Sequence, residues 1–162
     1  MGQKVKILDC TLRDGGYYNN WDFSPEIVKI DLVELGLRNF AKPGFLGAFA
    51  YSTEGFIDSL ALPEGPLYGV MVDAKTILGS ALSIESAIDA LFVPAKNSKL
   101  SFVRIASHFN EVEESAGIVR HLKNLGYIVG YNLMQAGGKD SELISNKAQV
   151  IKKWNAVDSL YF

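Results

Sequence analysis

The chain has 162 residues, of which 48% are hydrophobic and 21% are charged, and its formal net charge is -2. Length and composition are typical of one globular domain. The small negative charge excludes the basic face that nucleic-acid binding needs and the polybasic patch that attracts an anionic membrane. No apolar run is long enough to span a bilayer, and no secretory signal is visible. With a single cysteine, Cys10, and so no intrachain disulfide, we expect a protein of the reducing cytoplasm.

Short apolar runs alternate with amphipathic runs from one end of the chain to the other. Apolar residues at helical spacing predict helices, and short apolar runs between turn residues predict strands. The predicted strands cover residues 5–10, 38–45, 67–73, 100–106, 127–134 and 157–162. The predicted helices cover residues 24–36, 83–92, 110–126 and 140–155, with a short helix near 54–60.

Capping residues set the ends of these helices. Ser24 and Pro25 predict the start of the first helix, and Gly36 predicts its end. Asn110 and Glu113 have the spacing of a capping box, so the fourth helix is expected to begin there.

Strand–helix alternation with near-continuous apolar strands predicts an α/β fold with a parallel sheet. Such a sheet is either open and doubly wound or closed into a (β/α)8 barrel. A complete barrel takes about 250 residues, so length alone favours the open sheet.

The most informative stretch follows the first predicted strand and reads TLRDGG, residues 11–16. Ligands of parallel sheets bind at the carboxyl ends of the strands. Asp14 could hold a divalent cation there, and Arg13 could hold a carboxylate or an enolate oxygen. The same letters also suit an ordinary Asp-Gly turn with a solvated Arg-Asp pair.

The motif TLRDG resembles the first-strand signature of the metal-dependent aldolase and lyase barrels. These include hydroxymethylglutaryl-CoA lyase, isopropylmalate synthase and 4-hydroxy-2-oxovalerate aldolase, and the chain looks most similar to the last group. The segments 103–115, 126–135 and 157–162 resemble the fourth, fifth and sixth strands of that family. The resemblance implies parallel (β/α) units of a TIM barrel, with residues 1–162 as one partial barrel domain truncated after about strand 6.

The resemblance also implies roles for single residues. Asp14 matches the family's ligand to a divalent metal, Mg2+ or Mn2+, and Arg13 matches the arginine that stabilises the enolate. Tyr17 occupies the position of the family's acid/base histidine, although a tyrosine is a poor base near neutral pH. Candidate substrate-binding residues at the ends of the fourth and fifth strands are His108, Asn132 and Gln135, each of which could instead have a structural role.

The implied activity is that of a metal-dependent carbon–carbon lyase that cleaves a 4-hydroxy-2-oxo acid into pyruvate and an aldehyde. The family completes its metal site with a His-x-His pair, whereas this chain has only His108 and His121. Activity of this chain alone is therefore not expected. A Claisen-type acyl-CoA synthase or lyase on the same scaffold and a non-catalytic assembly protein remain alternatives.

Three further expectations concern packing. An unclosed barrel leaves unpaired strand edges, so we expect a homo-oligomer. Arg104 lies within the fourth strand and, if it points inward, needs a buried partner such as Asp9 or a substrate carboxylate. Asp73 and Lys75 follow the third strand, where an ion pair that closes the loop is expected ahead of a catalytic role.

Overall fold

The computed structural model describes residues 8–10, 14, 31–44 and 46–162. The predictions for Arg13, Tyr17 and residues 24–30 lie outside these ranges. The strands are β1 (Leu8–Asp9), β2 (Leu32–Leu37), β3 (Leu67–Asp73), β4 (Leu100–Ser107), β5 (Ile128–Leu133) and β6 (Ser159–Tyr161). The α-helices are α2 (Glu54–Ser59), α3 (Ala74–Leu78), α4 (Ile84–Leu91), α5 (Ala116–Asn124) and α6 (Ser141–Lys153), with 3-10 turns at Ala48–Ala50 and Ala95–Asn97. None of the helices in these ranges is long and apolar enough to cross a membrane.

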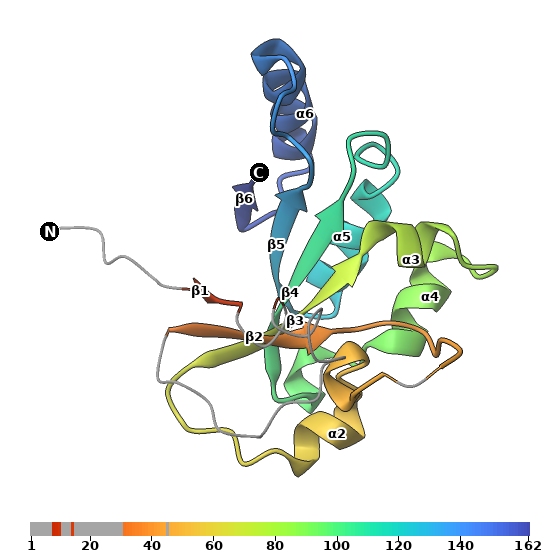
Figure 1. The fold of residues 1–162 in the computed structure, drawn as a ribbon, viewed down its shortest axis with the longest axis vertical. Coiled ribbons are helices and arrows are strands. Elements are labelled where there is room, and N and C mark those ends of the chain that lie inside the picture. The colour runs from red at the N-terminus through yellow and green to blue at the C-terminus, as the bar shows by residue number, and fades with distance from the viewer. Residues whose placement is uncertain (1–7, 11–13, 15–30, 45) are drawn as a thin grey trace, which may run out of the picture.

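The six strands are parallel and lie side by side in their sequence order, β1 to β6. A doubly wound sheet reverses its strand order part-way, and this sheet does not. Because parallel crossovers are right-handed, sequential order places the connecting helices on one face, and Figure 1 shows α3, α4 and α5 together on one side of β3–β5. The fold is thus α/β with a parallel sheet, which among the described strands stays open.

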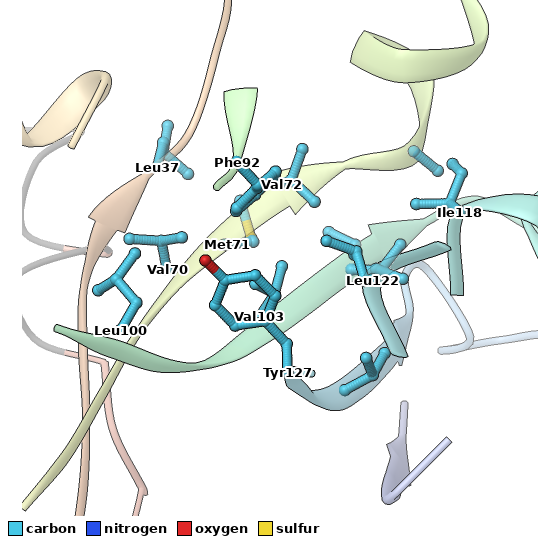
Figure 2. Packing of buried hydrophobic residues seen from close by; sticks show 14 of the residues in the cluster. Leu37, Val70, Met71, Val72, Phe92, Leu100, Val103, Ile118, Leu122 and Tyr127 are labelled. Atoms are coloured by element: carbon cyan, nitrogen blue, oxygen red, sulfur yellow. The ribbon is translucent and has the colours of Figure 1, made fainter. Parts of the chain in front are cut away.

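The face of the sheet that meets the helices carries the hydrophobic core. Val70, Val72 and Val103 are at most 1% exposed and belong to the same cluster as Ile118 and Leu122 of α5. Figure 2 shows these side chains gathered between the strands and the helix layer. Burial of each such side chain contributes about 1.5–3 kcal/mol, so this layer is the main source of stability.

The other face of the sheet carries a buried ion pair between β2 and β4. Arg104 donates from Nε to Glu34 Oε2 at 2.5 Å and from Nη2 to Glu34 Oε1 at 2.6 Å, and both side chains are at most 2% exposed. Neighbouring strands lie about 4.8 Å apart, so the arginine reaches across the whole width of β3. The guanidinium also lies 5.7 Å from the ring of Tyr161 in β6. Arg104 therefore points inward, as considered from the sequence, and its partner is Glu34.

The register of β2 against β3 shifts between Glu34 and Gly36. Glu34 pairs with Gly69 and Gly36 with Val70, so β2 has one residue more than β3 over this span. A Cβ atom at Gly36 would overlap the carbonyl oxygen of Phe49. Glycine is needed here because the 3-10 turn at Ala48–Ala50 packs directly on the strand backbone.

The predicted helix at 24–36 and strand at 38–45 are wrong where the structure describes them. Residues 32–37 form β2, and residues 38–44 form no regular element. The run from Leu32 to Leu37 is buried on both faces, and a short run of that kind does not show which period it follows. Pro43 cannot donate to a strand ladder, which accounts for the irregular backbone after β2.

Other predictions are confirmed, with one wrong boundary and one omission. Seven predicted elements are present, and each of their ends lies within two residues of the predicted one. They are the strands at 67–73, 100–106, 127–134 and 157–162 and the helices near 54–60, 83–92 and 140–155. The helix predicted from Asn110 begins only at Ala116, because Glu111 and its neighbours form turns in which the amide of Ser115 bonds to the carbonyl of Glu111 at 3.0 Å. Helix α3 was not predicted, since it has only five residues.

Replacement of Gly36 by alanine should lower the free energy of unfolding by about 2–3 kcal/mol, because the new methyl group overlaps fixed backbone. Gly55→Ala is the matched control, because a Cβ there meets nothing within 4 Å and its helix should gain about 0.5–1 kcal/mol. Urea denaturation of both variants measures the difference, and equal stability of the two would contradict the packing described here.

Replacement of Arg104 by methionine should cost about 3–5 kcal/mol, because it removes a buried cation that makes two hydrogen bonds to the carboxylate of Glu34. In the double variant Glu34→Gln with Arg104→Met, at least half of that loss should be recovered, since no charge remains buried. Chemical denaturation of the wild type and three variants gives the coupling. Additive losses would show that the two side chains do not depend on each other.

Candidate active site

The carboxyl ends of β3 and β4 form one wall of a pocket of about 340 Å³. Ligands of parallel sheets bind at this edge. The pocket is lined by Lys42, Asp73, Lys75, Thr76, Ala106, His108, Glu111 and Met134. A slightly larger pocket, of about 360 Å³, lies between the end of α6 and the start of β6, at the opposite end of the strands. Position and chemistry both favour the first pocket as the candidate site.

The strand register places polar side chains on the inner face of the sheet, which is the face opposite the helices and the one that carries the Glu34–Arg104 pair. Asp73 in β3 is in register with Ala106 in β4, and Ala106 is in register with Asn132 in β5. Residues in register on adjacent parallel strands point the same way. Asp73 and Asn132 therefore face the same side about 10 Å apart, with Ala106 at the position between them.

The loops around the pocket are held by hydrogen bonds. The backbone N–H of His108 donates to Glu111 Oε2 at 2.9 Å, which fixes the turn after β4. The backbone N–H of Lys42 donates to the hydroxyl of Tyr51 at 3.3 Å. The hydroxyl of Thr76 donates to Asn39 Oδ1 at 3.3 Å and joins α3 to the segment after β2. These three hydrogen bonds hold the segments that carry the pocket residues in place.

Asp73 differs from the other carboxylate of the pocket. It occupies the N-cap position of α3 but makes no capping hydrogen bond with its side chain. Burial raises the pKa of the Asp73 carboxyl and Glu111 raises it further, whereas Lys42 and His108 lower it in part. The ion pair expected between Asp73 and Lys75 is not formed, since among the described residues no amine or guanidinium lies within 4 Å of Asp73.

Of the predicted site residues that the structure describes, one lies in this pocket. His108 lines it and is half-buried. Asn132 lies on the inner face of β5 beside it, and Gln135 is exposed, does not line the pocket and has a left-handed backbone with a φ of 59°. His121 in α5 pairs with Asp89 at 2.7 Å and does not line this pocket.

Asp14 is exposed and follows β1 by one turn, with its backbone N–H bonded to the carbonyl of Cys10 at 2.9 Å. The end of β1 belongs to the same edge of the sheet as the pocket, because all strands are parallel. Across the part of the chain that the structure describes, no three His, Cys, Asp or Glu side chains are grouped so that they could hold a metal ion. The described residues alone therefore do not fit a complete metal site.

Sequence reasoning missed Lys42 and Glu111 as pocket residues. Lys42 belongs to a segment without regular structure, and Glu111 was assigned to a helix that begins five residues later. The end of β3, by contrast, was located correctly, and its position at the functional edge was the signal that could have promoted Asp73 to a candidate.

A solved structure shares this fold. It is described as the N-terminal domain of a "putative aldolase" from Bacteroides vulgatus and matches 97% of this chain with a TM-score of 0.69 and 23% sequence identity. The match spans 62% of that chain's own length. No family model and no curated protein matches the sequence. At this identity the likeness establishes the fold and its strand order.

Replacement of Asp73 by asparagine should raise the free energy of unfolding at pH 7 more than at pH 4. The pKa of this carboxyl is higher in the folded protein than in the unfolded chain, so wild-type stability falls as pH rises between the two values. Asparagine has no charge to bury and removes this penalty, which is absent in any case at low pH. Denaturation at both pH values measures the effect, with Asp58→Asn on the exposed side of α2 as control. A larger gain at pH 4 would contradict the prediction.

Proposed function

We propose that the chain carries the substrate-binding edge of a carbon–carbon lyase that cleaves a 4-hydroxy-2-oxo acid into pyruvate and an aldehyde. The observation that supports this is the gathering of Asp73, His108 and Glu111 with two lysines at the carboxyl edge of a sequentially ordered parallel sheet. Asp14 lies at the end of β1 on the same edge. The fold likeness to part of a chain described as a "putative aldolase" agrees with this class of reaction.

Aldol cleavage places two demands on a site. A group must accept the hydrogen bond, and then the proton, of the hydroxyl at carbon 4, and a cation must stabilise the charge that develops on the enolate oxygen. The pocket contains carboxylates and an imidazole for the first demand and the ammonium groups of Lys42 and Lys75 for the second. Neither lysine makes an ion pair with a described residue, so both charges are available to a substrate carboxylate or enolate.

Dependence on Mg2+ or Mn2+ is the part of the proposal that rests on Asp14. Carboxylate oxygens are ligands that these ions prefer, and such an ion would add Lewis-acid stabilisation of the enolate. Because the described residues form no three-ligand cluster, further ligands would have to come from outside them or from water and substrate.

Calorimetric titration with Mn2+ tests the metal dependence. We expect micromolar binding to the wild-type chain and at least tenfold weaker binding to Asp14→Ala. Asp58→Ala, which removes an exposed carboxylate from α2, should bind as the wild type does. Absence of binding to the wild type, or equal binding to Asp14→Ala, would reject Asp14 as a ligand and with it the metal-dependent form of the proposal.

A further inference from the structure

The side chain of Asp73 makes neither of the two interactions that usually hold an aspartate in place, a capping hydrogen bond and an ion pair with a described residue. An aspartate at a helix N-cap normally accepts a hydrogen bond from the first turn of that helix, and this one does not. It also has no ion pair within 4 Å among the described residues, although it is half-buried. Glu111, the other carboxylate of the pocket, is already occupied by the N–H of His108. Among the described residues, the oxygens of Asp73 and Oε1 of Glu111 therefore receive no hydrogen bond.

The surroundings of Asp73 leave room for a small molecule. Ala106 is its neighbour in register and lines the pocket beside it, and its side chain is a single methyl group. The pocket of about 340 Å³ exceeds the roughly 30 Å³ of one water molecule about tenfold. Met134 adds an apolar wall, while Lys42 and Lys75 add positive charge at the exposed rim.

We propose that Asp73 accepts a hydrogen bond from the 4-hydroxyl group of the substrate and thereby selects hydroxylated 2-oxo acids over their deoxy analogues. The inference rests on the proposed function and deepens it, because it assigns the aldehyde half of the substrate to the space above Ala106. Asp73 lines the pocket and receives no hydrogen bond from a described residue, so its carboxylate is available to a donor on a bound ligand. A hydroxyl group supplies that donor without adding a charge next to Lys42.

The inference predicts a specificity that depends on one residue. A hydrogen bond to a charged acceptor changes affinity about tenfold or more. The wild type should therefore bind 4-hydroxy-2-oxopentanoate at least tenfold more tightly than 2-oxopentanoate, which differs only in the missing hydroxyl group. In Asp73→Asn, the ratio of the affinity for 4-hydroxy-2-oxopentanoate to that for 2-oxopentanoate should fall to about one third of its wild-type value or below. The affinity for 2-oxopentanoate itself should not change.

Calorimetric titration of both ligands, in the presence of Mn2+, into wild type, Asp73→Asn and Asp58→Asn tests the inference. Asp58→Asn should keep the wild-type ratio, since Asp58 is exposed on α2. Unchanged binding of the deoxy ligand to Asp73→Asn shows that the variant is folded and that its other contacts are intact.

The remaining outcomes separate the two proposals. A wild-type preference that survives in Asp73→Asn, or a wild type that binds both ligands equally, overturns the role of Asp73 but leaves a site for 2-oxo acids. A wild type that binds neither ligand overturns the proposed function and this inference together. Loss of both ligands from Asp73→Asn alone assigns that residue to the general shape of the pocket and also overturns the selective role.

Discussion

The ion pair between Glu34 and Arg104 determines how the middle of this sheet is assembled. The two residues come from strands that are not neighbours, and their contact passes over β3. A charge buried without its partner is very unfavourable, so β2, β3 and β4 must meet in one register or not at all. The pair lies one inward-facing position below Asp73 and Ala106, since Met71 and Arg104 are in register. A buried ion pair therefore lies beneath the candidate site.

Much of this arrangement could be predicted from the sequence, and the failures have physical causes. Strand β3 and helix α4 were located closely because each has a clear pattern and, in α4, a Ser83 cap that accepts from the amide of Ser86 at 3.2 Å. Strand β2 was misread because apolar residues at helical spacing, a start at Ser24 and Pro25 and an end at Gly36 predicted a helix that included it. The burial of Glu34 in this strand depends on Arg104, 70 residues away, and no local pattern contains that information.

For the candidate site, the sequence predicts the location but not the full set of pocket residues. The edge where ligands should bind follows from strand polarity alone, and the sequence predicts Asp14, His108 and Asn132 as candidates on it. The composition of the pocket depends on Lys42 and Glu111, which come from irregular segments. Such segments are positioned by single contacts, for example the bond from Lys42 N–H to the hydroxyl of Tyr51. Contacts of that kind are tertiary and leave no periodic trace in the sequence.

The extra residue in β2 has an electrostatic consequence. In a strictly alternating strand, Glu34 and Arg38 would point to the same face, and Arg38 would join Arg104 as a second guanidinium beside a single carboxylate. The shifted register instead turns Arg38 toward the helices, where it donates to the carbonyl of Leu91 at 2.6 Å and to Glu54 at 2.9 Å. The extra residue in β2 thus places the guanidinium groups of Arg38 and Arg104 on opposite faces of the sheet.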